Sequence, residues 1–213
     1  MGRTSDADQR LMDAAFELVW TQSYGVVTID DICKKAGVKK GSFYYFFDSK
    51  EQLAVSALDR LWNTDWKPRM DEIFSASVEP LDRLKNYLSG IHLRSVETKA
   101  RFGRMIGCPV ASVGSEVGTQ ECSICSKIRE ILKRKHRYVE ATVREAMANG
   151  SIEAGDPVKR TVVLTSFIEG MMLQARTNND PEILKGLHEM GLEILRVKET
   201  AEPAKSPALA GTR

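Results

Sequence analysis

The stretch TIDDICKKAGVKKGSFYYFFDSKEQL, residues 28–53, decides the fold of the first quarter of the chain. It contains five consecutive aromatic residues, 43–47, although the whole chain has only 7 Phe, 5 Tyr and 3 Trp. On a helix that starts near residue 40, Phe43 and Phe47 lie four residues apart and point the same way, into a core. The three rings between them cannot all point inward as well. Some of these rings must therefore be exposed, next to a group of lysines: Lys39, Lys40 and Lys50.

The residues before this aromatic run predict two short helices joined by a tight turn. Thr28 is the expected N-cap of the first, at about 29–36, because two aspartates follow it in the first turn. Gly37 is expected to end that helix, and the second starts near Lys40. This is the layout of a helix-turn-helix, whose second helix meets base edges and phosphates in the major groove. A tyrosine hydroxyl can bond a phosphate while its ring rests on a sugar or a thymine methyl. A plain helical hairpin with surface aromatics is the alternative.

The same stretch resembles the DNA-binding segment of the TetR family of transcriptional regulators. The shared features are the threonine that opens the first helix, the AGV turn, the GSFY of the second helix and the F-x-S-K-E-x-L that follows. The resemblance implies a homodimer on a palindromic double-stranded DNA operator, most often a repressor, that a small-molecule effector releases. It also implies a set of DNA-contacting residues: Thr28, Lys39, Lys40, Ser42, Tyr44, Tyr45 and Lys50. Phe46 departs from the pattern, because many relatives carry histidine there.

The composition is that of an ordinary globular protein, with 42% hydrophobic residues, 28% charged residues and a net charge of +2. A basic surface must therefore come from the arrangement of charges rather than from an excess of them. The opening residues have no apolar core typical of a secretory signal, and no apolar run reaches the ~18 residues of a membrane span. We expect a cytoplasmic protein with no membrane partner and with reduced thiols at its four cysteines, 33, 108, 122 and 125.

Helical periodicity dominates the chain, and no convincing strand pattern is present. The predicted fold is all-α: an N-terminal three-helix helix-turn-helix DNA-binding domain at 1–48, a larger helical ligand-binding and dimerisation domain at 49–200, and a disordered tail at 201–213. Pro68 is expected to bend or break the helix that follows Ser49. The other expected helices span about 5–23, 29–36, 40–46, 80–95, 100–106, 118–148, 157–178 and 181–198.

The larger domain has two expected roles. Its last two helices mix small and apolar residues, and the resemblance implies that they form a four-helix interface in the dimer; an ordinary intrachain core is the alternative. The preceding helices would enclose a cavity for a mostly apolar effector. Each candidate lining residue could instead belong to a plain core: Trp62, Trp66, Tyr87, Phe102, Met105, Phe167, Met171 and Gln174.

The segment RMIGCPVASVGSE, residues 104–116, places Cys108 at an expected helix start, where free amides predict a lowered thiol pKa. Some TetR-family regulators with a similar Gly-Cys segment sense oxidants or electrophiles through that cysteine; a buried apolar role is the alternative. Cys122 and Cys125 share a helical face and allow a dithiol switch.

No metal-ligand spacing, catalytic constellation or Gly-rich phosphate loop is present, so we predict neither an enzyme nor a cofactor. A helical binding protein that has lost DNA binding remains an alternative.

Overall fold

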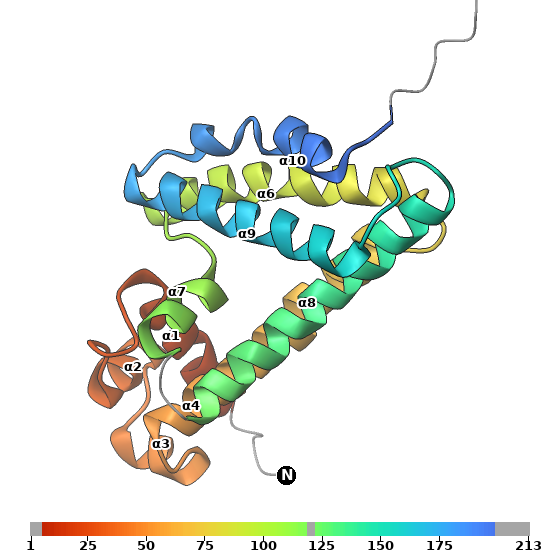
Figure 1. The fold of residues 1–213 in the computed structure, drawn as a ribbon. Helices are drawn as coiled ribbons and strands as arrows, with labels where there is room; N and C mark the ends of the chain where they lie inside the picture. The colour runs from red at the N-terminus through yellow and green to blue at the C-terminus, as the bar shows by residue number, and fades with distance from the viewer. Residues whose placement is uncertain (1–5, 119–121, 199–213) are drawn as a thin grey trace, which may run out of the picture.

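The computed structural model describes residues 6–118 and 122–198, and within them the regular structure is helical apart from an isolated bridge between Ile152 and Val197 (Figure 1). The all-α fold predicted from the sequence is confirmed. The helical elements are α1 (Ala7–Thr21), α2 (Ile29–Ala36), α3 (Lys40–Phe46), α4 (Lys50–Leu61), the π-helix η1 (Trp62–Trp66), α5 (Lys67–Ile73), α6 (Pro80–Phe102), α7 (Pro109–Val117), α8 (Ser123–Ala148), α9 (Pro157–Thr177), the 3-10 helix η2 (Pro181–Leu184) and α10 (Leu187–Leu195).

Helices α1, α2 and α3, with the start of α4, form a small unit that we name the head (Figure 1). Each of these helices contributes one fully buried side chain to a shared core: Leu11, Ile32, Phe43 and Leu53. Burial of a large apolar side chain contributes about 1.5–3 kcal/mol. The head therefore depends on a few well-packed residues, and its short helices could not persist alone.

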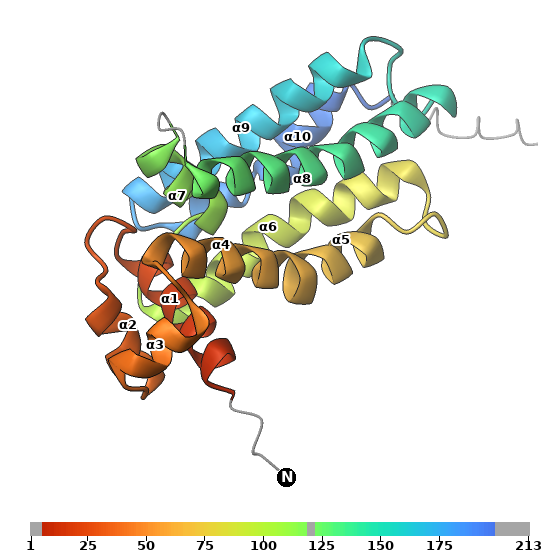
Figure 2. The same ribbon diagram turned by 90° about the horizontal axis from the view of Figure 1, so that it is seen from below.

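The remaining helices form the body. Helix α8 runs from the head to the far end of the molecule, with α4 and α5 beside it (Figures 1 and 2). Its inner face packs on α6 and α9, and α10 covers α6 and α9 from the other side. Leu88, Val139, Leu164 and Leu187 are fully buried in this main core. Within the described residues, none of the helices combines the length and the apolar character that crossing a membrane requires.

The sequence predicted that Pro68 would bend or break the helix that begins at Lys50, and the α-helical pattern is interrupted just before this residue. The π-helical turn η1 joins α4 directly to α5, and Pro68 lies in the first turn of α5. Proline has no N–H to donate to the carbonyl four residues earlier, and its ring would clash with that carbonyl in a regular α-helix. The wider π-helical turn accommodates the ring. The same turn buries Trp62 and leaves Asp65 and Trp66 on the wall of a cavity.

Three of the expected helix boundaries were wrong. Helix α6 continues through residue 100 to Phe102 and ends where Gly103 takes a φ of +71°, so no separate helix spans 100–106. The helix expected at 118–148 is α8, which begins at Ser123, and the shorter helix α7 precedes it. The expected helix 181–198 is η2 followed by α10, and Arg196 ends α10 in a left-handed conformation. The tail predicted at 201–213 lies outside the described residues.

Candidate functional site

The turn between α2 and α3 fixes the direction of α3. Gly37 ends α2 with a φ of +64°, which residues with a Cβ rarely adopt. At the other end of α2, the Thr28 hydroxyl accepts the Asp31 N–H at 3.1 Å, and the Asp31 carboxylate accepts the Thr28 N–H at 3.0 Å. This capping box pairs two of the donors that a helix start leaves free. The Thr28 hydroxyl also donates to the Asp31 carboxylate at 2.6 Å, and this bond, together with the one from the Thr28 N–H, lowers the pKa of the Asp31 carboxyl.

The aromatic run divides between core and surface along α3. Phe43 is 0% and Phe47 7% exposed, whereas Tyr44 is 54% and Tyr45 81% exposed. Phe46 is half-buried, and its ring meets that of Tyr45 edge-on at 4.8 Å between centroids. The two tyrosines therefore extend from the head on a helix whose other face is anchored in the core, as the helical period predicts.

The lysines next to α3 differ in their ion pairing. Lys39 is exposed and has no ion-pair partner among the described residues. Lys40 lies 2.9 Å from Asp30, but both side chains are exposed. An exposed pair of this kind contributes little to stability, so its lysine can exchange the carboxylate for a phosphate. Ser42 is partly buried in the first turn of α3, and its N–H donates to the Lys39 carbonyl.

Lys50 is bound inside the head instead of standing free at the surface. Its ammonium donates to the carbonyls of Tyr24 at 2.8 Å and Val27 at 2.9 Å, and it lies 4.4 Å from the centroid of the Tyr24 ring. Lys50 thus holds the loop before α2 against α4. Sequence reasoning missed this role, because the carbonyls come from residues more than twenty positions away. Contact between Lys50 and DNA stays a prediction.

A cavity of about 730 Å³ lies between the head and the body. Its walls come from α1, the end of α4, η1, α5, α6, α8, α9 and the segment that leads into the start of α7. Four of the eight residues proposed from the sequence line it: Trp66, Tyr87, Phe102 and Met105.

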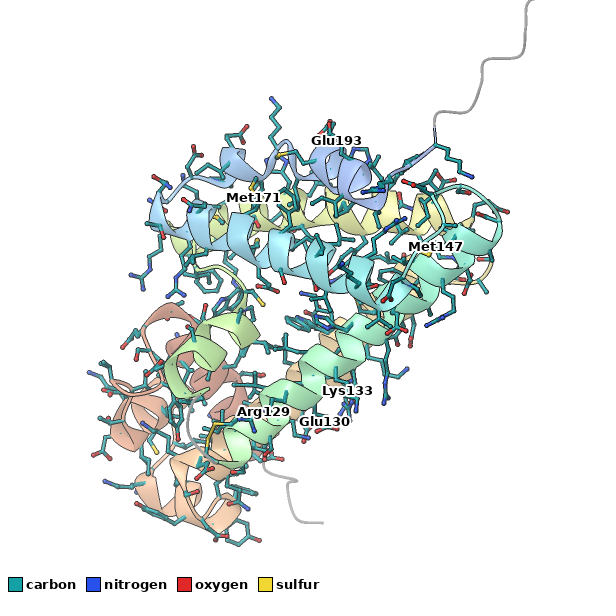
Figure 3. All side chains as sticks on the ribbon, viewed as in Figure 1. Arg129, Glu130, Lys133, Met147, Met171 and Glu193 are labelled. Carbon is teal, nitrogen blue, oxygen red and sulfur yellow. A yellow bond between two sulfur atoms is a disulfide. The ribbon has the colours of Figure 1, made fainter. Side chains whose placement is uncertain are left out.

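The other four proposed lining residues lie elsewhere. Trp62 is buried in the core between α4, α7 and α8, Phe167 and Met171 (Figure 3) pack against the main core, and Gln174 is exposed. The residues of α9 that face the cavity are Ile168, Glu169 and Met172. The sequence-based assignment placed the inner stripe of α9 one or two positions away, and each position turns a side chain by about 100° around a helix.

Sequence reasoning missed an ion pair on the cavity wall. The Lys135 ammonium lies 3.1 Å from the Glu169 carboxylate, and their side chains are 13% and 31% exposed. Burial lowers the pKa of Lys135, but the surrounding acidic groups, Tyr87, Cys108 and Glu169, outweigh it and raise the pKa overall. Lys135 stands in the basic run KRKHR, which is typical of a solvated surface. However, it continues the buried stripe of Ile128, Ile131 and Val139 at helical spacing, a signal that could have located it.

Cys108 is a free thiol on the cavity wall, at the N-cap of α7. Burial and the nearby Glu169 raise its pKa, and the opposing influences of Lys135 and of the amides of Ala111 and Val110 are smaller. The expectation that the helix start lowers this pKa was therefore wrong. Helix-start amides favour a thiolate, but burial in an apolar wall penalises that charge more strongly.

Cys122 and Cys125 are joined in a disulfide at the start of α8, the yellow bond in Figure 3, so the expectation of four reduced thiols was wrong. The same end of α8 contacts the head, because the Glu51 carboxylate accepts the Ser123 N–H at 2.8 Å. Hydrogen bonds from Ser123 lower the pKa of Glu51. Among the described residues, no three His, Cys, Asp or Glu side chains are grouped as a metal site would require.

Helix α9 carries an exposed stripe of apolar and small residues along its outer face, with Lys159 near its start. Val158, Val162 and Leu173 are large apolar residues on this stripe, and Ser166 and Gly170 lie between them. Contiguous exposed apolar surface of this kind marks an interaction site on soluble proteins.

A helix-turn-helix head with exposed tyrosines, joined to an all-helical body, defines a DNA-binding transcriptional regulator. Two family models match successive parts of the chain. Residues 11–57 match the bacterial regulatory proteins of the tetR family, and residues 80–190 match the tetracyclin repressor-like C-terminal domain. The chain belongs to the TetR family, whose members are regulators and not enzymes.

Individual relatives agree with this assignment. The transcriptional regulator AcuR of Cereibacter sphaeroides is 31% identical over 180 residues, which cover 84% of this chain and 80% of that protein. The repressor NemR of Escherichia coli is 25% identical over 84% of this chain and 89% of its own length. A crystal structure of a regulatory protein TetR from Rhodobacter sphaeroides is similar with a TM-score of 0.78 and 28% identity, over 89% of this chain and 99% of that one.

Proposed function

We propose that this protein is a repressor that binds a palindromic operator as a homodimer and leaves it when an effector enters the cavity. The exposure of Tyr44 and Tyr45, 54% and 81%, carries the proposal. Exposed rings beside Lys39 and Lys40, on a helix whose other face is buried, suit contact with sugar, phosphate and thymine methyl groups. Thr28 and Ser42 lie at the starts of α2 and α3, where a helix-turn-helix meets the DNA backbone.

The exposed stripe of α9 supports the homodimer. A single recognition helix reads few base pairs, so two copies related by a two-fold axis are needed for a specific site. The stripe itself consists of apolar and small residues, and Gly170 lets two backbones approach each other closely. With α10 beside it, α9 supplies the helix pair that a four-helix interface requires.

The position of the cavity supports release by an effector. Phe16 and Trp20 of α1 line it on the head side, and residues of α6 and α8 line it on the body side. A ligand that touches both units prefers one head position over another. A difference of about 1–3 kcal/mol in affinity between the two states would produce a useful response. The aromatic rings in the wall suit an effector with an apolar body.

Recovery of bound fragments from the protein's own genome would test DNA binding directly. We expect enrichment of a palindromic site, and fluorescence anisotropy should then give affinity that falls steeply with salt. An absence of enriched fragments would contradict the proposal and favour a helical binding protein that has lost DNA binding.

A second candidate function is sensing by the Cys108 thiol. Its free thiol faces the same cavity, so a reactive compound that enters would meet it. A solved structure titled the reduced form of E. coli NemR shares this fold, with a TM-score of 0.77. Cys108→Ser separates the two functions: release by an unreactive compound that persists in this variant supports noncovalent sensing, and release that requires Cys108 supports the thiol route.

A further inference from the structure

The charged side chains of the cavity are either paired or exposed to solvent, except Arg94, which is partly buried. Arg69 pairs with Asp65, and Lys135 pairs with Glu169. Arg94 lines the same cavity from α6 and makes no hydrogen bond or ion pair with any described residue. Burial and the nearby Arg69 cation lower its pKa, although Asp65 and Glu97 attract it from a greater distance. A guanidinium nevertheless stays charged in proteins, so the cavity holds a cation without a direct partner.

Arg94 is partly buried on α6 and lies close to Gly90, where an added Cβ would come within 2.6 Å of its Nη1 atom. A partly buried charge without a partner is costly to the folded protein. Such a cost is typical of a site that a ligand completes.

Tyr87 offers a second donor to the same cavity. Its side chain is only 3% exposed, its ring packs on Phe74 with 5.3 Å between centroids, and it lies on the cavity wall. Its hydroxyl is buried and has no hydrogen-bond partner among the described residues. Tyr87 and Arg94 are seven residues apart on α6, which places them on one face, two turns from each other. An unpaired buried hydroxyl also costs free energy unless a ligand satisfies it.

We infer that the effector is an organic monoanion, a carboxylate on an apolar or aromatic body, whose charged end is held by Arg94 and Tyr87. The partly buried guanidinium of Arg94 can balance one negative charge, and its planar group matches the two oxygens of a carboxylate. The apolar body lies against the aromatic wall of the cavity, which includes Trp20, Trp66 and Phe102. A volume of about 730 Å³ is within the range of small-molecule sites. This inference rests on the proposed function, because it names the ligand class of the same cavity.

Calorimetric titration of the full chain tests the inference with two matched pairs of probes: octanoate against octanamide, and 3-phenylpropanoate against 3-phenylpropanamide. Each pair has nearly the same shape and differs in charge. We expect the carboxylate of at least one pair to bind the wild-type protein at least tenfold more tightly than its amide. Arg94→Gln should lower the carboxylate affinity roughly 10- to 100-fold and leave the amide affinity unchanged. Tyr87→Phe should remove a smaller part of the same preference.

The control variant is Arg144→Gln, which removes the same charge from the exposed surface of α8, away from the cavity, and should leave the carboxylate preference intact. Arg94→Gln removes an unpaired charge, so its melting temperature should not fall, and Tyr87→Phe is an independent second test. Carboxylates that bind no better than amides, or that do not bind at all, overturn the inference, as does a preference that survives Arg94→Gln.

Operator release by each probe is measured separately, so that the two proposals can fail independently. An amide that binds as tightly as its carboxylate and releases operator DNA would uphold the proposed function and overturn the carboxylate assignment. A carboxylate that binds through Arg94 without releasing DNA would uphold the anion site and overturn its role in regulation.

Discussion

Lys50→Met should destabilise the head in the absence of DNA. The ammonium of Lys50 donates to two carbonyls, those of Tyr24 and Val27, and lies over the Tyr24 ring. A hydrogen bond from a charged donor contributes about 1.5–3 kcal/mol and a cation–π contact about 0.5–1 kcal/mol. Water can reach part of this loop and restore some of the loss, so we expect a net destabilisation of about 2–4 kcal/mol. That is a large fraction of the 5–15 kcal/mol typical of a folded domain.

Hydrogen exchange of the free protein would measure this effect where it arises. Amides of the loop before α2, and of α2 and α3, should exchange faster in Lys50→Met, while amides in the core of α8 should not change. The matched control is Lys39→Met, because Lys39 is an exposed lysine of the same head without an ion pair among the described residues. It should leave exchange unchanged and weaken operator binding.

If Lys50→Met leaves exchange and melting unchanged but weakens operator binding and reduces the salt dependence by about one phosphate contact, Lys50 acts on DNA. The two carbonyls would then be satisfied by water, and the contacts seen in the free protein would contribute little.

Three further predictions concern α3, α9 and the thiol of Cys108. Tyr45→Ala should change the stability of the free protein by less than about 0.5 kcal/mol, because the ring is 81% exposed. The same variant should weaken operator binding by about 1–3 kcal/mol. An operator affinity equal to that of the wild-type protein in a binding titration would show that this ring is not at the DNA. Val162→Asp places a charge in the apolar stripe of α9 and should convert a dimer to a monomer in sedimentation experiments, whereas Lys133→Asp, at an exposed position on α8, should not; a stable Val162→Asp dimer would exclude this face. Since the pKa of Cys108 is raised, its thiolate fraction at pH 7 is below that of an ordinary cysteine and grows only as the pH rises through the raised pKa. Alkylation of Cys108 by iodoacetamide, followed by peptide mass spectrometry, should therefore be slower than alkylation of glutathione at pH 7; faster alkylation would contradict the assignment.

The sequence predicted the head well because its structure is set by contacts along short segments. The division of rings on α3 follows from the 3.6-residue period alone, and Gly37 and Thr28 mark the ends of α2 by local chemistry. The position of Lys50 could not be predicted in this way, because its partners belong to a distant loop.

The cavity was harder to predict because it depends on how several helices are rotated against each other. Trp66, Tyr87, Phe102 and Met105 were found because a helix that buries one face makes large side chains conspicuous. Arg94 and Lys135 were missed, since a charged residue in a helical pattern usually faces water. Only the packed structure shows that α6 and α8 turn these two cations toward a shared space.

A hydrogen bond between head and body lies on the wall of the cavity, and the energy needed for switching explains why the proposed regulator would need two copies of that cavity. The Trp20 indole donates to the Gly107 carbonyl at 3.0 Å, and both residues line the cavity, so a ligand there acts directly on this hydrogen bond. Driving a two-state equilibrium from 1:99 to 99:1 requires about 5.5 kcal/mol of differential binding. One effector supplies about 1–3 kcal/mol, and two identical sites in a symmetric dimer supply about twice that. At the upper end of that range, a dimer in which both heads must match one operator can therefore switch nearly completely, whereas a single occupied cavity would leave much of the protein on its DNA.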